Sequence, residues 1–237
     1  MKRILTITAT VLLCIIATSC RQNFKGSPKS NTVLSKYTND YDGIDVSHHQ
    51  GDIDWRTVAK DTNIRFVYIK ATEGKTYIDK KYNTNIEQAR KAGLLVGSYH
   101  YFRMTSTPKE QFEHIKRNID KNEQDLIPMI DVETSDNKNL NAVRSSLKEL
   151  IDMVEAHYGK KPLIYGTMRS YNTICAPYFN DHLLYIGRYS STKTPEIKGK
   201  GNAAIWQFSE KGKIDGIPKP VDLCRFSENV SIDNLKM

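Results

Sequence analysis

The segment LIPMIDVETSD, Leu126 to Asp136, decides the fold expected of this chain, because an apolar run ends there in two carboxylates separated by one valine. Side chains two residues apart on a strand point to the same face, with a rise of about 6 to 7 Å between them. The run before the acids predicts a buried strand, from Leu126, Ile127, Met129 and Ile130. Asp131 and Glu133 are therefore expected on one face at the end of that strand.

Two acids at this spacing suit the hydrolysis of a glycosidic bond, in which one carboxyl donates a proton and the other orients or attacks the sugar. The alternative is a polar strand end that water solvates. The buried strand favours the first interpretation, since an idle acid pair next to a core is costly.

Two further acids occupy similar positions in the sequence. Asp45 lies in a short apolar strand within YDGIDVSHHQGDIDW, and Asp222 lies in KPVDLCRF near the C-terminus. Asp45 has an alternative role, because its side chain could cap the turn that follows. Neither residue is informative by itself.

The first 40 residues differ from the rest of the chain. Residues 1–20, MKRILTITATVLLCIIATSC, have a basic start, an apolar stretch and small residues before Cys20, which is the layout of a lipoprotein signal peptide. Residues 21–40 are polar and contain Gly, Ser, Pro and Asn, as expected of a flexible linker. We therefore expect an exported protein anchored through a lipid on Cys20 and facing the periplasm, or alternatively a secreted one.

Composition describes an ordinary globular domain over residues 41–237, with 39% hydrophobic and 26% charged residues in the whole chain. The formal net charge is +8, but the Lys and Arg residues are scattered, so we expect no nucleic-acid partner. Cys175 and Cys224 either pair or remain two separate buried thiols. No Cys/His spacing suggests a metal site, and no cofactor is expected.

Short apolar strands alternate with helical segments along the domain, which predicts parallel strands joined by crossover helices. The last three strands have little room for helices between them. We therefore expect an α/β fold, a modified TIM-type barrel of eight strands with fewer helices than strands. The expected strands are GIDVS, RFVYIKAT, LLVGSYHYF, LIPMIDVE, PLIYGT, LLYIGRY, AAIWQFS and PVDLCRF, and the expected helices are 82–92, 109–121 and 141–158.

A barrel of this kind gives the acids a common location, because its active site lies at the C-terminal ends of the strands. All four acids fall late in their expected strands. Several aromatic residues do the same, and their flat faces can stack on sugar rings, although core packing is the alternative for each. These aromatic residues are Tyr99, Tyr101, Tyr165 and Trp206. Lys70 and Glu73, in KATEG, are expected to form an ion pair nearby.

With these residues in place, the chain resembles the family 25 glycoside hydrolases, the lysozymes that cleave peptidoglycan. The resemblance runs from Tyr41 to Phe226 and rests on GIDVSHHQG, YIKATEG, AGLLVGSYHYF, MIDVE, IWQFS and VDLCRF in the family's order. It implies an eight-stranded barrel that acts on the bond between N-acetylmuramic acid and N-acetylglucosamine with retention of configuration. Cys224 replaces the family's usual asparagine, and Arg188 stands where a smaller residue is expected.

The resemblance makes Glu133 the expected general acid, with its pKa raised by Asp131 and by partial burial. Retention requires attack either by the substrate's own 2-acetamido group, oriented by Asp131, or by Asp131 itself. We favour the first route. Asp45 and Asp222 are expected to tune the electrostatics, and the expected substrate-binding residues are Tyr99, Tyr101, Tyr165, Trp206, Gln207 and Lys70.

Two other classes of protein remain open. A catalytically silent wall-binding module would not need both acids, and a chitinase-like glycosidase of the substrate-assisted kind would show a longer run of alternating aspartates before the glutamate. The expected partners are the glycan strands of peptidoglycan and, through Cys20, the membrane. We expect the enzyme itself to be a monomer.

Overall fold

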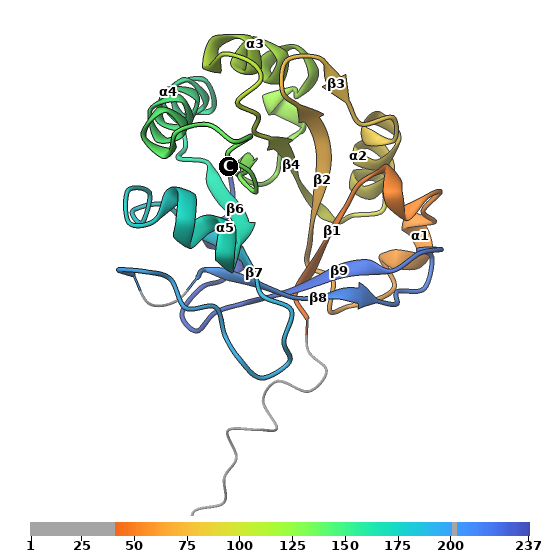
Figure 1. The fold of residues 1–237 in the computed structure, drawn as a ribbon. Helices are drawn as coiled ribbons and strands as arrows, with labels where there is room; N and C mark the ends of the chain where they lie inside the picture. Colours follow the sequence, from red (N-terminus) through yellow and green to blue (C-terminus); the bar gives the residue numbers. More distant parts are fainter. Residues whose placement is uncertain (1–40, 201–202) are drawn as a thin grey trace, which may run out of the picture. The chain divides into compact units, whose positions relative to one another are not determined.

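Nine strands form one sheet in the computed structural model, which describes residues 41–200 and 203–237 (Figure 1). The sheet order is β1-β9-β8-β7-β6-β5-β4-β2-β3, and an additional β1–β2 pairing closes eight of the strands into a barrel. The strands are β1 (Gly43–Val46), β2 (Phe66–Glu73), β3 (Tyr77–Ile78), β4 (Leu95–Tyr101), β5 (Met129–Asp131), β6 (Leu163–Thr167), β7 (Leu184–Gly187), β8 (Ile205–Gly212) and β9 (Val221–Phe226).

The barrel is parallel except at one strand. Neighbouring strands from β1 round to β8 pair in parallel, whereas β9 runs antiparallel to both β8 and β1. All eight strands expected from the sequence are present, and β3 is an extra short strand paired with the end of β2. The predicted barrel is confirmed, with the antiparallel closure as the feature that the sequence left open.

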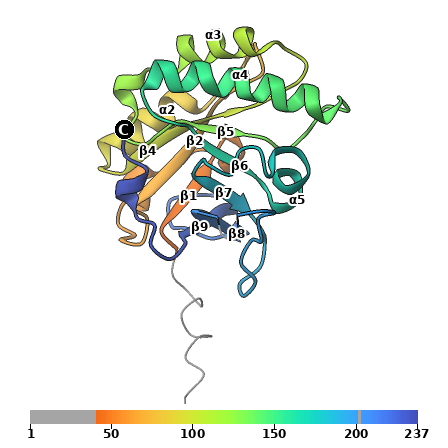
Figure 2. The same ribbon diagram turned by 90° about the vertical axis from the view of Figure 1, so that its left-hand side faces the viewer.

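The described region contains five α-helices, which lie outside the barrel (Figures 1 and 2). It therefore has fewer α-helices than strands, as expected. The α-helices are α1 (Trp55–Val58), α2 (Tyr82–Lys91), α3 (Pro108–Asn118), α4 (Leu140–Tyr158) and α5 (Met168–Ser170). The described region also contains three 3₁₀ turns, η2 (His48–Gln50), η3 (Lys121–Glu123) and η5 (Ile232–Asn234), and one π-helical turn, η4 (Tyr171–Cys175).

Helix α4 shows how the sequence sets these elements. Asn139 caps its first turn by accepting a hydrogen bond from the Asn141 amide at 2.9 Å, and Gly159 ends it with a φ of 77° that favours glycine. The apolar positions at helical spacing are all buried against the barrel, as the pattern predicted: Val143, Leu147, Leu150, Ile151 and Val154.

The core has two layers because side chains alternate along each strand. On β2, Phe66 and Tyr68 point into the barrel, whereas Val67 and Ile69 point outward to the layer beneath the helices. At the N-terminal end of the strands, the C-terminal segment closes the barrel, because Leu235 is fully buried and its carbonyl accepts from the Ile127 amide at 2.7 Å. The candidate active site lies at the opposite end of the barrel, where the parallel strands end.

Candidate active site

A pocket of about 200 Å³ lies at the C-terminal ends of the parallel strands and gathers all four predicted acids. Asp131 is the last residue of β5, and Glu133 follows it by two, so both point into the pocket while Val132 packs in the outer layer of the core. The lining residues are Asp45, Ser47, His49, Lys70, Tyr99, Tyr101, Met129, Asp131, Glu133, Tyr165, Tyr189, Gln207 and Asp222.

Asp45 and Asp222 are brought together by the antiparallel pairing of β1 with β9, in which they are directly opposite. Tyr185 and Gln207 both donate hydrogen bonds to Oδ2 of Asp45, at 2.6 and 2.9 Å. Asp45 is thus held as a hydrogen-bond acceptor rather than as a cap for the following turn, which Ser47 caps instead. Burial, followed by the charge of Asp45, raises the pKa of Asp222 to about 9, so Asp222 holds a proton at neutral pH.

Asp131 is buried in the pocket and, within residues 41–200 and 203–237, lacks a hydrogen-bond partner on one oxygen. Only 6% of it is exposed, and its Oδ1 atom has no hydrogen-bond partner among the described residues. Burial raises the pKa of its carboxyl well above the usual value, and the nearby charge of Glu133 adds to the effect. A buried acceptor without a partner costs about 1 to 3 kcal/mol. A donor on a bound molecule would satisfy Oδ1 and would favour the charged form of Asp131.

Glu133 lies at the mouth of the pocket and is more exposed than Asp131. Desolvation raises its pKa first, and the charge of Asp45 raises it further, whereas the charge of Lys70 and a hydrogen bond from Tyr101 act in the opposite direction. The direction agrees with the sequence prediction, and Asp45, on β1, adds to the rise. Asp131 lies deeper, and the charge of Glu133 raises its pKa, so each acid of the pair disfavours ionisation of the other.

Three tyrosines and a lysine form the other walls. Tyr99, Tyr101 and Tyr165 line the pocket, and the Tyr165 hydroxyl donates to Oε1 of Gln207 at 2.8 Å. A Cβ at Gly187 would lie 2.9 Å from Oε1 of Gln207 and 3.1 Å from the Tyr165 hydroxyl, so glycine is needed for this close approach.

Lys70 lies beside these aromatic rings. Its Nζ atom is 2.9 Å from Oε2 of Glu73, which confirms the predicted ion pair, and 4.9 Å from the centre of the Tyr101 ring. The Lys70 charge favours the ionised forms of both Asp131 and Glu133 and thus limits the rise in their pKa values. It is therefore placed to influence both members of the acid pair.

Trp206 is the one predicted binding residue that does not line the pocket. It precedes Gln207 on β8, so alternation directs it to the opposite face, where Nε1 donates to the Arg188 carbonyl at 2.7 Å. The Arg188 side chain also points elsewhere, with Nη1 donating to the Thr194 carbonyl at 2.8 Å. Neither side chain reaches the pocket directly, and the expected effect of Arg188 on a subsite has no support from this geometry.

Four lining residues were not identified from the sequence: Ser47, His49, Met129 and Tyr189. Three of them lie an even number of residues from a side chain that faces the inside of the barrel, which is the same alternation that identified Glu133. Ser47 lies two residues after Asp45, Met129 lies two before Asp131, and Tyr189 lies four after Tyr185, whose side chain is inside the barrel. His49 has no such signal, because the turn η2 interrupts the strand pattern before it.

The two described cysteines are both free and buried, in different layers of the core. Cys175 packs in the layer beneath the helices, whereas Cys224 lies inside the barrel. Of the two alternatives left by the sequence, separate buried thiols are thus the correct one. Among the described residues no cluster of His, Cys, Asp or Glu is suited to a metal ion, and no helix there is long and apolar enough to span a membrane.

Comparison with known protein families gives a match to the model of glycosyl hydrolases family 25 over residues 44–217. The chain belongs to this family. It is 36% identical over 192 residues to an uncharacterized Escherichia coli protein, YegX, covering 79% of this chain and 70% of that one. It is 32% identical over 190 residues to the autolytic lysozyme of Clostridium acetobutylicum, covering 80% of this chain and 57% of that one.

Solved structures of the family show the same fold. A family 25 glycosyl hydrolase from Bacillus anthracis superimposes with a TM-score of 0.74 at 33% identity, covering 82% of this chain and 93% of that one. A lysozyme from Streptomyces coelicolor gives a TM-score of 0.72 at 27% identity, covering 84% and 96%. The barrel and its family, both predicted from the sequence, are therefore confirmed, and the chain is a glycoside hydrolase.

Proposed function

We propose that this family 25 hydrolase is a lysozyme that cleaves the β-1,4 bond between N-acetylmuramic acid and N-acetylglucosamine in peptidoglycan. The observation that carries the proposal is the convergence of Asp131 and Glu133 on one pocket, where burial raises the pKa of both. Relatives described as lysozymes support the same substrate class.

In the proposed mechanism, Glu133 donates a proton to the oxygen of the departing sugar. Its raised pKa keeps it protonated closer to neutral pH than an ordinary glutamic acid, which general acid catalysis requires. Its position at the pocket mouth leaves it accessible to a glycosidic oxygen. After departure, the Glu133 carboxylate accepts a proton from water and activates it for the second step.

The nucleophile in this proposal is the substrate's own 2-acetamido oxygen, which attacks the anomeric carbon and forms an oxazoline within the sugar. The buried Oδ1 of Asp131 supports this role, because it can accept a hydrogen bond from the acetamido N–H and orient the group. Water then opens the oxazoline, so two inversions give net retention. Direct attack by Asp131 is the alternative, and it would leave a covalent glycosyl ester on the enzyme.

Asp45 and Asp222 support the pair indirectly in this scheme. The Asp45 carboxylate accepts from Tyr185 and Gln207, and its charge raises the pKa of Glu133. Asp222, held protonated at neutral pH, donates its proton to Asp45 and can accept a hydrogen bond from a substrate hydroxyl or amide through its other oxygen. Tyr99, Tyr101 and Tyr165 provide aromatic walls for the sugar rings, and Gln207 and Lys70 provide polar contacts.

Digestion of purified peptidoglycan, followed by identification of the new reducing-end sugar, tests this proposal directly. A muramidase produces reducing-end N-acetylmuramic acid. A reducing-end N-acetylglucosamine would refute the assigned bond, and release from chitin instead of peptidoglycan would favour a chitinase-like enzyme. Binding without any release would identify a silent wall-binding module, although the intact acid pair argues against it.

We also propose a cellular location, from residues that lie outside the described region. The signal layout of residues 1–20 and Cys20 immediately after Ser19 favour cleavage before Cys20 and attachment of lipid there. Two or more acyl chains give stable anchoring, and residues 21–40 then act as a tether towards the wall. The full-length bacterial protein is expected to fractionate with membranes and to behave as a monomer.

Cys20→Ser is expected to move the protein to the soluble fraction without loss of muramidase activity. Membrane fractionation and mass spectrometry of the mature N-terminus check this expectation. A wild-type protein that is wholly soluble and begins beyond residue 20 without lipid would show simple secretion instead.

A further inference from the structure

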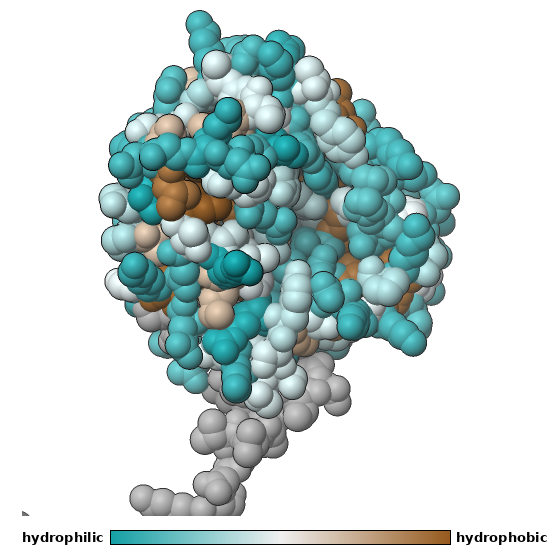
Figure 3. All heavy atoms as spheres, viewed as in Figure 1, coloured by the Kyte–Doolittle hydropathy of each residue, from teal (hydrophilic) through white to brown (hydrophobic). Residues whose placement is uncertain are grey.

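A second pocket, of about 380 Å³, lies on the outer flank of the barrel between α4 and the segment that follows η4. Its lining residues are Asn141, Arg144, Ser145, Lys148, Tyr178 and Phe179, and none of them lines the active-site pocket. Figure 3 shows hydrophobic residues at the surface on the side of the molecule where Figure 1 places α4 and α5. The family assignment and the mechanism leave this pocket without a role.

Tyr178 is the most unusual residue in this pocket, because 63% of it is exposed, the largest value among the exposed large hydrophobic residues of the described region. Phe179 beside it is 5% exposed and anchors the segment in the core. A single exposed aromatic side chain is common on protein surfaces. Here, however, the ring borders a cavity, so one side of it is available to a flat, partly apolar partner such as a sugar ring.

Arg144 holds the Tyr178 ring from one side. Its guanidinium carbon is 4.5 Å from the ring centre, within the range of a cation–π contact. Nε donates to the Ile174 carbonyl at 2.7 Å, and Nη2 donates to the Thr173 carbonyl at 3.1 Å. These bonds fix the guanidinium before any ligand arrives, which lowers the entropy that binding would cost.

The charge of the pocket indicates an anionic partner. Arg144 and Lys148 line it, and no acidic residue does. The hydrogen bonds of Arg144 go to neutral carbonyl and amide oxygens, which leave its positive charge uncompensated, whereas Lys148 pairs with Asp152 at 2.7 Å on the exposed face of α4. Asn141 and Ser145 add polar groups for hydroxyls or amides.

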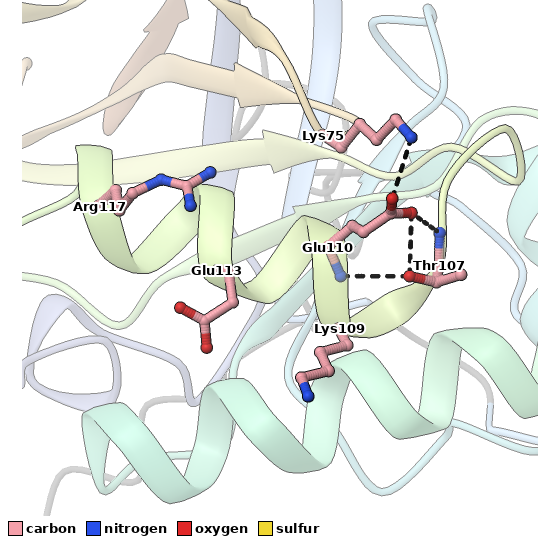
Figure 4. Close-up of a pocket in the computed structure, with 6 residues that line it drawn as sticks. All are labelled: Lys75, Thr107, Lys109, Glu110, Glu113 and Arg117. Carbon is pink, nitrogen blue, oxygen red and sulfur yellow. Dashed lines mark hydrogen bonds and ion pairs between the residues drawn. The ribbon is translucent and has the colours of Figure 1, made fainter.

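A pocket of similar size on α3 provides a comparison (Figure 4). Its volume is about 370 Å³, but it has no aromatic residue, and two acids, Glu110 and Glu113, line it beside its cations. Lys75 is 2.9 Å from Glu110, which also accepts from Thr107, so these side chains already satisfy one another. The α3 pocket therefore offers a control surface of similar size and different chemistry.

We propose that the α4–η4 pocket is a second binding site for peptidoglycan, in which Tyr178 stacks on a sugar ring and Arg144 binds a carboxylate of the same polymer. Lys148 exchanges its exposed partner Asp152 for a second carboxylate, at little cost because an exposed ion pair contributes little. This inference rests on the proposed substrate. Peptidoglycan combines flat sugar faces with the carboxylates of lactyl groups and peptides, which matches the pocket's ring and cations. A glycan strand held in this pocket, whether the one being cleaved or a neighbouring one in the wall, raises the effective concentration of wall polymer at the active site.

The test measures binding of the full chain to purified peptidoglycan sacculi by sedimentation, in a Glu133→Gln background so that the wall is not digested. Tyr178→Ala is expected to weaken binding about three- to tenfold, whereas Tyr178→Phe keeps the ring and keeps the affinity. Lys148→Gln is expected to weaken binding about two- to fivefold, and the matched Lys109→Gln in the α3 pocket is expected to have no effect. Thermal unfolding of each variant verifies that it is folded.

Activity gives a second readout in the chain that retains Glu133. Tyr178→Ala is expected to slow hydrolysis of insoluble sacculi and to leave hydrolysis of a short soluble peptidoglycan fragment unchanged. The inference is overturned if Tyr178→Ala binds sacculi as wild type does, if Lys109→Gln weakens binding as much as Lys148→Gln, or if neutral chitin is bound equally well with the same dependence on Lys148.

The same measurements separate this inference from the proposed activity. A chain that binds sacculi through Tyr178 but hydrolyses nothing would refute the activity and support the site. A chain that hydrolyses sacculi with no dependence on Tyr178 would do the reverse.

Discussion

Replacement of Glu133 by glutamine removes the proposed proton donor and preserves the shape of the side chain. General acid catalysis typically contributes about a hundredfold to ten-thousandfold in rate. This range corresponds to about 3 to 5 kcal/mol in the activation barrier. We therefore expect Glu133→Gln to lower turnover on purified peptidoglycan by at least a hundredfold, as measured by the release of reducing ends.

The structure also predicts how this substitution affects folding. Glu133 lies at the pocket mouth, and a glutamine oxygen can accept the same hydrogen bond from Tyr101. The Glu133 pKa is higher in the folded state than in the unfolded chain. Ionisation of Glu133 therefore opposes folding once the pH exceeds the pKa of this carboxyl in the unfolded chain. Glu133→Gln is therefore expected to melt at the same temperature as wild type near pH 3 and at an equal or higher temperature at pH 7.

Glu149→Gln is a matched control, because Glu149 is exposed on α4 and does not line the pocket. It is expected to keep both activity and melting temperature. Retention of more than about a tenth of wild-type turnover in Glu133→Gln would contradict the role of general acid, given the range expected for that role. A marked fall in its melting temperature at pH 7 would contradict the electrostatic reasoning.

Three further predictions follow from the same structure. If the acetamido group is the nucleophile, a mechanism-based fluoro-sugar should leave the protein mass unchanged, whereas mass spectrometry that finds a stable adduct on Asp131 would make that residue the nucleophile. Asp222, whose pKa is raised from 3.8 to about 9 in the folded state, destabilises the fold progressively as the pH rises between these values. Asp222→Asn should therefore raise the melting temperature at pH 7 but not at pH 3, and an equal change at both would refute the protonation state assigned to Asp222. Leu147→Ala, at a fully buried position of α4, should lower the free energy of unfolding in urea by about 2 to 5 kcal/mol, and a loss below about 1 kcal/mol would show that the site collapses around the cavity.

The sequence by itself determined the elements and the direction of many side chains. Alternation along a strand is a local property, so the segment from Leu126 to Glu133 was sufficient to predict a buried strand with two acids on one face. Helical spacing likewise identified the buried face of α4 from Val143 to Val154. The order of motifs along the chain was specific enough to indicate the family, and the match over residues 44–217 confirmed it.

Only the tertiary structure decided which residues meet. The antiparallel pairing of β9 with β1 places Asp222 opposite Asp45, and it depends on contacts between residues 177 positions apart that no local pattern encodes. Barrel closure also brings the charge of Asp45 close enough to raise the pKa of Glu133. Backbone periodicity fixes the face of a side chain within its own strand, but the neighbours of that face are set by barrel closure, which is a property of the whole chain.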